Sequence, residues 1–255
     1  MNLLVVGDVM TDIDITCEIV KWYGDAPVLR ELSRIERPGG AANVAEMCKA
    51  LGAEVLLCGV LDTNREPTIK RRFLVEGNLI ARHDTETTAP YLWSIAEQAI
   101  LLDFLSGADG VIVADHGKGF VQRTLLEMAC CSDVPVFIDP VPTTPVVHGD
   151  NITWIGSDSE IPTDMRGRKI IKLGRDGVRF FTCEHGWQTL PSECLDCVDD
   201  VGAGDQFIAS FAVAMVSGCC LSDAVYYANR DAGEQCRRTG IRPVTHLIKA
   251  WSRQC

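Results

Sequence analysis

Short apolar runs alternate with longer amphipathic stretches along most of this chain. The first run, Leu3-Leu4-Val5-Val6, is continuous and ends at Gly7-Asp8. Such a run is typical of a strand that is buried on both faces of a parallel sheet. Similar runs predict further strands at residues 55–58, 110–113, 134–138, 169–171 and 178–181.

Helical segments are expected between these strands and after them. The composition favours helices at residues 41–51, 89–104, 121–131, 206–217 and 222–237. Strands and helices that alternate in this way predict an α/β fold, in which helices cover both faces of a mostly parallel central sheet. We expect ligands at the carboxyl ends of these strands, where several acidic residues lie.

Two other segments have a different pattern. Residues 12–16 alternate between polar and apolar side chains, and residues 28–32 are compatible with an extended chain. Residues 73–75 and 79–80 flank a turn signal and predict a hairpin. We therefore expect a small antiparallel sheet formed by about residues 12–35 and 67–84, which acts as a lid on a single domain spanning residues 1–255.

Composition narrows the function classes. A chain of 255 residues with 47% hydrophobic content can fill the core of one enzyme domain. The net charge of −11 argues against nucleic acid or an anionic membrane as a partner. No apolar run approaches the roughly 18 residues that span a bilayer, and the N-terminus has no signal-like start, so a cytoplasmic protein is expected.

The chain contains 12 cysteines, which do not have the spacing of a secreted disulfide scaffold. Reduced and mostly buried thiols are the default expectation. Cys194 and Cys197 form the one C-x-x-C pair, without the second pair or the histidines that a zinc site needs. The sequence assigns this pair no role.

The most informative motif lies near the C-terminal end. Gly202, Ala203 and Gly204 precede Asp205 and an apolar helix-like stretch. Small residues at a helix start can direct backbone N–H groups at an anion, and the helix dipole favours negative charge there. Asp205 is then positioned to accept a proton from a hydroxyl group during phosphoryl transfer. The alternative is an ordinary glycine turn capped by an aspartate.

Together these segments resemble the ribokinase-like (phosphofructokinase B type) carbohydrate kinases, most closely their heptose-7-phosphate kinase group. The similarity extends, with gaps, from residue 3 to about residue 245. The matching motifs are residues 6–12, 37–45, 114–119, 138–140 and 202–205.

The resemblance implies a role for each matched residue. Asp205 would be the catalytic base, and Gly202, Ala203 and Gly204 would form the anion hole. The sugar would be held by Asp8, Asp12, Gly39, Gly40 and Asn43, with Lys118 reaching a phosphate. The nucleotide, ATP with Mg²⁺, would be bound by Ser157, Lys172, Gly174, Gly177 and Asn229, and Glu160 would assist the metal.

The chain also departs from the family pattern. Ser157 replaces the asparagine of Asn-x-x-Glu, Asp200 replaces a threonine, and Val141 stands where heptose kinases usually have lysine. The segments between residues 59 and 67 and between residues 160 and 169 are shortened. Three hypotheses follow: an active sugar or sugar-phosphate kinase, a degenerate member that binds ligand as a regulatory subunit, and a nucleoside kinase. A homodimer through the lid sheet is expected by analogy.

Overall fold

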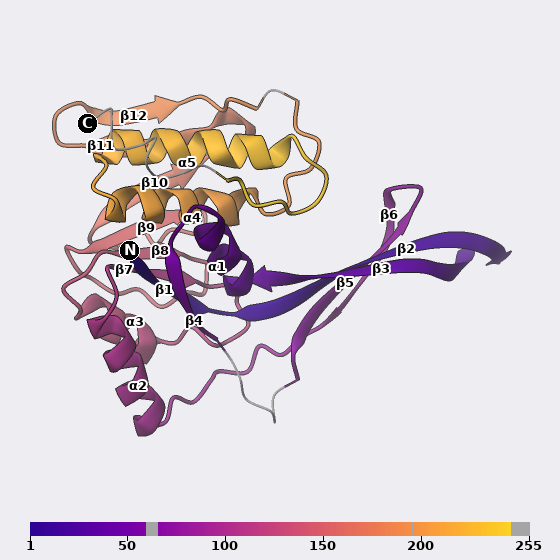
Figure 1. Ribbon diagram of the computed structural model, residues 1–255, viewed down its shortest axis with the longest axis horizontal. Coiled ribbons are helices and arrows are strands. Elements are labelled where there is room, and N and C mark those ends of the chain that lie inside the picture. The colour runs from indigo at the N-terminus through magenta and orange to yellow at the C-terminus, as the bar shows by residue number, and fades with distance from the viewer. Residues whose placement is uncertain (60–65, 195, 246–255) are drawn as a thin grey trace.

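The computed structural model describes residues 1–59, 66–194 and 196–245. It consists of an α/β body and a separate sheet that extends away from it (Figure 1). The predicted fold class is confirmed, since the body contains a mostly parallel sheet between two layers of helices. Among the described residues, no helix combines the length and the apolar character needed to cross a bilayer.

The central sheet has eight strands in the order β12-β11-β10-β9-β8-β7-β1-β4. The six neighbouring strands β4, β1, β7, β8, β9 and β10 pair in parallel. Strands β11 and β12 add an antiparallel edge. The sequence pattern did not predict β9 and β12. The eight strands of this sheet are β1 (Asn2–Gly7), β4 (Glu54–Cys58), β7 (Gly110–Ala114), β8 (Val136–Asp139), β9 (Ile152–Gly156), β10 (Arg168–Lys172), β11 (Val178–Thr182) and β12 (Gly186–Leu190).

Helices cover both faces of this sheet because successive side chains of each strand point to opposite sides. Leu3 and Val5 belong to one apolar cluster, and Leu4 and Val6 belong to the other. The first cluster packs against α1 (Ala41–Ala50), α4 (Ala203–Val216) and α5 (Leu221–Cys236), and the second against α2 (Ile95–Ser106) and α3 (Arg123–Cys130).

Helix α2 begins later than the apolar pattern predicted. Residues 89–94 are not helical, and α2 starts after Ser94, whose hydroxyl accepts a hydrogen bond from the Glu97 amide. The Glu97 carboxylate in turn accepts one from the Ser94 amide, which completes a capping box. The cap therefore fixes the helix start six residues after the predicted one.

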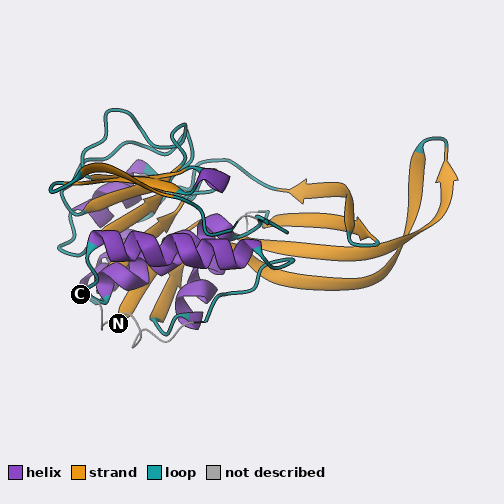
Figure 2. Cartoon of the chain, turned by 90° about the horizontal axis from the view of Figure 1, so that it is seen from above, coloured by secondary structure: helices purple, strands orange, loops and turns teal. Residues whose placement is uncertain are grey.

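The second sheet has the order β3-β2-β5-β6 and corresponds to the small sheet that was predicted; its role as a lid stays a prediction, and we use the name lid for these four strands (Figure 2). It comprises β2 (Val9–Tyr23), β3 (Ala26–Gly40), β5 (Thr68–Val75) and β6 (Asn78–Thr85). The expected hairpin is present between β5 and β6, where Glu76 and Gly77 adopt positive φ angles of 51° and 82°. The sheet is mixed, since its central pair β2–β5 is parallel. The segment between residues 59 and 67, which the sequence indicated to be shortened, consists mostly of residues 60–65, outside the described residues.

Candidate active site

The candidate site lies at the carboxyl edge of the central sheet, where the base of the lid meets the body. Asp8, Asp115 and Asp139 stand at the ends of β1, β7 and β8, and Lys172 ends β10. Helices α1 and α4 both begin beside this edge, after Gly40 and Gly202. Acidic residues at several strand ends are therefore gathered as the sequence pattern predicted.

Asp205 and Asn43 meet at the centre of the site. The Asn43 amide nitrogen donates a hydrogen bond of 2.6 Å to Oδ2 of Asp205. Asn43 lies in the first turn of α1 and is 1% exposed. This contact orients the Asp205 carboxylate from a second helix and leaves Oδ1 as its other acceptor.

The start of α4 has the geometry of an anion site. Gly202 is the N-cap residue and has a φ angle of +80°, which a side chain would strain. The Ala203 amide donates a hydrogen bond of 3.1 Å to the Asp200 carbonyl oxygen. Opposite this turn, Nζ of Lys172 lies 3.4 Å from the position that a Cβ on Gly204 would occupy. A cation and a helix N-terminus thus converge on one point.

The charge state of Asp205 is set by competing effects. Burial raises the pKa of the Asp205 carboxyl, and the nearby Asp139 carboxylate adds to this rise. The charge of His116 and the hydrogen bond from Asn43 lower the same pKa. A carboxylate with a raised pKa is a stronger proton acceptor than one in water, which suits a general base.

Lys172 remains a cation at this site. Burial lowers its pKa, but the attraction and hydrogen bond of Asp139, together with the charges of Glu160 and Asp205, outweigh burial, so the pKa of Lys172 is raised. Its Nζ donates a hydrogen bond of 2.7 Å to Oδ1 of Asp139. Asp139 therefore holds the ammonium group at the strand ends. The sequence pattern had indicated no separate role for Asp139.

The predicted sugar-binding glycines lie at the junction of β3 and α1. A Cβ on Gly40 would come within 2.3 Å of the Asp8 carbonyl oxygen, and Gly40 has a φ angle of +57°. A Cβ on Gly39 would lie 3.1 Å from Oδ1 of Asp12. This Asp12 oxygen is buried and has no hydrogen-bond partner in the part of the chain that the structure describes. An unpartnered buried acceptor beside a glycine pair fits a hydroxyl group of a ligand.

Asp8 contacts the protein backbone. Its Oδ2 accepts hydrogen bonds from the amides of His116 (2.8 Å) and Lys118 (3.0 Å), and its Oδ1 accepts one from Phe120 (3.0 Å). With 2% of its surface exposed, Asp8 holds the loop after β7 in place. Its direct contact with a sugar stays a prediction.

Lys118 lies where charged residues from the lid approach the same loop. Its Nζ donates a hydrogen bond of 2.5 Å to Glu86. Burial lowers the pKa of Lys70 on β5, and the positive charges of Arg82 and Lys118 act in the same direction. Cations from two lid strands and from the body therefore lie close together.

A cavity of about 680 Å³ adjoins the first turn of α4. Of the residues predicted to bind nucleotide, Lys172, Gly174, Gly177 and Asn229 line this cavity, together with Ala203 and Gly204 of the predicted anion hole. Asn229 donates a hydrogen bond of 2.8 Å to the Pro191 carbonyl oxygen, which joins α5 to the opposite wall. The structure thus brings together predicted residues that are up to 57 positions apart, from Lys172 to Asn229.

Ser157 and Glu160 form a compact turn after β9. Oε2 of Glu160 accepts a hydrogen bond of 2.7 Å from the Ser157 amide, and the two serine hydroxyls of this turn, Ser157 and Ser159, lie 3.1 Å apart. Glu160 is near enough to Lys172 to raise the pKa of that lysine. Within the described ranges, no group of three acidic, histidine or cysteine side chains could hold a metal ion.

Three cysteines whose sequence pattern indicated no function line the same cavity. Cys194 is buried, Cys197 is exposed and Cys236 is half-buried. The Val198 amide donates a hydrogen bond of 2.8 Å to the Cys236 carbonyl oxygen, which ties the C-x-x-C segment to the end of α5. The one indication in the sequence that Cys194 and Cys197 lie near the site is their position just before residues 199–205.

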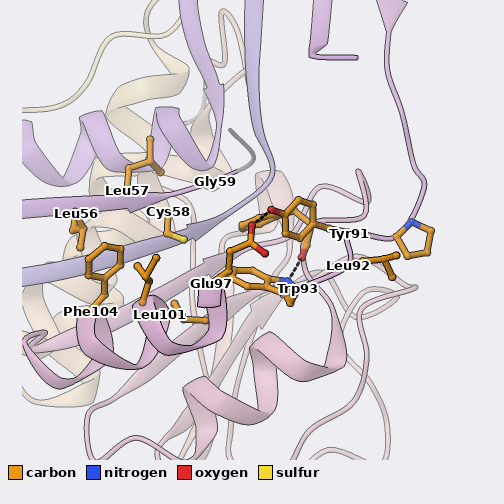
Figure 3. Close-up of a pocket in the computed structure, with 13 residues that line it drawn as sticks. Leu56, Leu57, Cys58, Gly59, Tyr91, Leu92, Trp93, Glu97, Leu101 and Phe104 are labelled. Carbon is orange, nitrogen blue, oxygen red and sulfur yellow. Dashed lines mark hydrogen bonds between the residues drawn. The ribbon is translucent and has the colours of Figure 1, made fainter. Parts of the chain in front are cut away.

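A second cavity, of about 780 Å³, lies between the edge strand β4 and α2 (Figure 3). Its lining is apolar and aromatic, with Tyr91 and Trp93 facing Leu101 and Phe104. Among the described residues that line it, Glu97 is the one carboxylate, and that group accepts hydrogen bonds from Ser94 and from the Tyr91 hydroxyl. Since these hydrogen bonds already engage Glu97, the described lining offers no free acid or cation for phosphoryl transfer.

Comparisons with known proteins find a carbohydrate kinase family model and curated relatives that are similar to this chain. Residues 164–246, which include the Lys172 loop and residues 202–205, match the model described as pfkB family carbohydrate kinase. The bifunctional protein HldE of Salmonella dublin is 28% identical over 96% of this chain and 62% of its own length. The HldE protein of Ectopseudomonas mendocina is also 28% identical, over 91% of this chain and 59% of its own length. The chain thus spans about three fifths of these relatives.

Solved structures share the fold at low sequence identity. Ribokinase from Thermotoga maritima has a TM-score of 0.70 at 18% identity and covers 99% of both chains. Ribokinase from Arabidopsis thaliana, in complex with ribose and ATP, has a TM-score of 0.68 at 18% identity, over 98% of this chain and 97% of its own. A nucleoside kinase from Methanocaldococcus jannaschii has a TM-score of 0.65 at 16% identity, over 99% of this chain and 97% of its own. The ribokinase-like fold is shared by all three.

Proposed function

We propose that this chain is a ribokinase-like carbohydrate kinase. It would transfer a phosphoryl group from ATP to a hydroxyl group of a sugar or sugar phosphate. One observation carries the proposal. The half-buried Asp205 lies in the first turn of α4, next to Gly204, which faces the Lys172 ammonium group and lines a cavity of about 680 Å³.

The proposed mechanism assigns a task to each of these groups. Asp205 accepts the proton of the attacking hydroxyl, and Asn43 holds its carboxylate in position. The backbone N–H groups at the start of α4 and the Lys172 ammonium stabilise the charge on the transferring phosphoryl group. Lys172, held by Asp139, would supply part of this positive charge.

The sugar is proposed to bind at the base of the lid, beside the glycine pair that ends β3. Support comes from the unpartnered Asp12 oxygen beside Gly39 and from the close approach that Gly39 and Gly40 allow. Asp8 acts in this proposal by fixing the loop that carries Lys118. The nucleotide would occupy the cavity lined by Gly174, Gly177 and Asn229.

A heptose phosphate is the favoured substrate. The motif resemblance points to the heptose-7-phosphate kinase group, and the similarity to the HldE proteins supports it. The cations Lys70, Arg82 and Lys118, gathered beside the sugar site, would suit a substrate that carries its own phosphate.

Magnesium is proposed as the metal that accompanies ATP. Mg²⁺ retains several water molecules and binds mainly through substrate phosphates, so a site without a full protein cage is compatible with it. Glu160, beside Lys172, is the carboxylate that would lie nearest to the phosphates. The ion would neutralise charge on the transferring group.

A ligand-binding subunit without turnover is the second candidate. Ser157 and Asp200 alter two family positions next to the nucleotide, and Asp200 lines the cavity. The intact arrangement of Asp205, Asn43 and Lys172 favours the active enzyme. The nucleoside kinase hypothesis predicts the same base with a different acceptor.

An ADP-release assay with a panel of acceptors separates these hypotheses. The panel contains D-glycero-D-manno-heptose 7-phosphate, ribose, fructose and adenosine, each with ATP and Mg²⁺. Turnover of a sugar supports the proposal, and turnover of adenosine alone supports the nucleoside kinase. Calorimetric binding of ATP without any turnover would support the regulatory subunit.

The predicted homodimer through the lid is also a proposal. The outer part of the lid exposes Trp22 (61%), Tyr23 (81%), Leu32 (59%) and Ile35 (51%), which are large apolar side chains for a surface. Light scattering during gel filtration tests this directly. A mass near 56 kDa, twice the 27.9 kDa of the chain, is expected, and a monomer at all concentrations would contradict it.

A further inference from the structure

His116 has an unusual environment that the proposed mechanism does not use. Its Nε2 atom is buried and has no hydrogen-bond partner within the described part of the chain. Buried side-chain polar atoms in proteins nearly always have a partner, from the protein, from water or from a ligand. The unpaired nitrogen therefore marks a position where a polar atom from outside the protein is expected.

The backbone around His116 is fixed by two buried acids. Its amide donates to Oδ2 of Asp8 at 2.8 Å, and the next amide, of Gly117, donates to Oδ1 of Asp115 at 2.8 Å. The Asp115 carboxylate also accepts a hydrogen bond of 2.6 Å from the Thr144 hydroxyl. The loop is thus held on both sides of His116, so the position of the imidazole follows from the fold.

The ring lies against the glycine pair and close to the catalytic base. Cδ2 of His116 is 3.1 Å from the position that a Cβ on Gly40 would occupy. The unpaired Nε2 is the ring atom bonded to this Cδ2. The charge of His116 is also the strongest of the charges that lower the pKa of Asp205. The imidazole therefore lies beside one of the proposed sugar-binding glycines and near enough to the proposed base to affect its pKa.

We propose that His116 is a substrate-contacting residue, whose Nε2 forms a hydrogen bond with a sugar hydroxyl beside the one that Asp205 deprotonates. The inference rests on the proposed function, because it places the sugar in this site. A hydroxyl group suits an imidazole nitrogen whether or not that nitrogen carries a proton, since a hydroxyl both donates and accepts hydrogen bonds. The contact would select sugars that carry a hydroxyl at this position.

The test is a double-mutant cycle between the histidine and the sugar. The probe is D-glycero-D-manno-heptose 7-phosphate together with analogues that each lack one hydroxyl group. In the wild-type protein, loss of the contacted hydroxyl is expected to lower kcat/KM by roughly 10-fold. In His116→Phe the same analogue and the full sugar should react equally, whereas analogues lacking other hydroxyls should show the same loss as in the wild type.

Two further variants make the result specific. His116→Gln can place a polar atom near the Nε2 position, so it should restore most of the discrimination. His185→Phe removes an imidazole from the exposed turn between β11 and β12, where the side chain is 70% exposed, and should leave all ratios unchanged. A purely structural role for His116 would lower the rate with every analogue by the same factor and would overturn the proposal.

The same cycle, measured as binding constants by calorimetry, separates this inference from the proposed function. Selective coupling in binding without turnover would support His116 and contradict the kinase activity. Turnover without any coupling would support the kinase and overturn the role of His116. If the probe sugar and ribose both fail to bind, both proposals are overturned.

Discussion

Asn43 on α1 donates a hydrogen bond of 2.6 Å to Asp205 on α4, across 162 residues of sequence. Both residues lie in the first turn of their helices, so the contact joins two helix starts at one edge of the sheet. The lid continues directly into α1 through Gly40. The bond therefore connects the proposed base with the part of the chain that is proposed to hold the sugar.

The replacement Asp205→Asn should remove the proton acceptor with little change in shape. We expect kcat to fall by about 10²-fold or more, because a positioned general base typically contributes that much. ATP affinity should stay nearly the same, since Asp205 is not expected to bind the nucleotide. Steady-state kinetics and calorimetry with ATP measure the two effects. Equal activity in the variant and the wild type would remove Asp205 from the mechanism.

The replacement Asn43→Ala should change the pH dependence of the reaction. The hydrogen bond from Asn43 lowers the pKa of Asp205, so its loss should raise that pKa further above the ordinary value. Because the base must be ionised, the acidic limb of kcat/KM should move to higher pH, and activity should be lost sooner as pH falls. At the pH where the wild type is half active, a reduction of roughly 10-fold is expected.

Lys49→Met is a suitable control for that experiment. Lys49 lies on the same helix, but it pairs with Glu46 at the surface. Its loss should leave the pH profile in place. An unchanged acidic limb in Asn43→Ala would show that this amide does not tune the base.

The replacement Asp200→Thr should strengthen ATP binding. Asp200 lines the nucleotide cavity and places a negative charge beside the proposed polyphosphate position. Relief of this repulsion should lower the Kd for ATP by about 2- to 5-fold, as is typical of exposed charge pairs. Asp164→Thr makes the same charge change at an exposed position in the loop before β10 and should have no effect. Weaker binding in Asp200→Thr would mean that the carboxylate has a favourable role.

Alkylation of Cys197 should block the nucleotide cavity. This thiol is exposed and lines the cavity, so a bulky maleimide attached to it would occupy the space proposed for ATP. Burial and the neighbouring Cys197 raise the pKa of Cys236 to about 12, so that thiol should stay protonated and react slowly at neutral pH.

ATP should protect the protein from this inactivation, which is followed by residual activity and by mass spectrometry. Cys197→Ser should be resistant, whereas Cys131→Ser should remain sensitive, because Cys131 is an exposed thiol outside the cavity. Inactivation of Cys197→Ser at the wild-type rate would place the sensitive thiol elsewhere.

Much of the fold could be predicted because it depends on local rules. The continuous apolar run at residues 3–6 and its successors specify buried parallel strands, since side chains alternate between two covered faces. The positive φ angles at Gly40 and Gly202 agree with glycines that the motifs singled out. By contrast, β9 (Ile-Thr-Trp-Ile-Gly) and β12 (Gly-Trp-Gln-Thr-Leu) were missed, since polar residues interrupt their short apolar runs.

The sequence by itself determined the fold class, the lid and the motif that contains Asp205, because backbone geometry and side-chain periodicity act over a few residues. Tertiary structure decided which distant groups meet. It paired Asn43 with Asp205 and Asp139 with Lys172, and it left Nε2 of His116 without a partner. These relationships depend on how strands and helices pack, and burial then sets the strength of each charge and hydrogen bond.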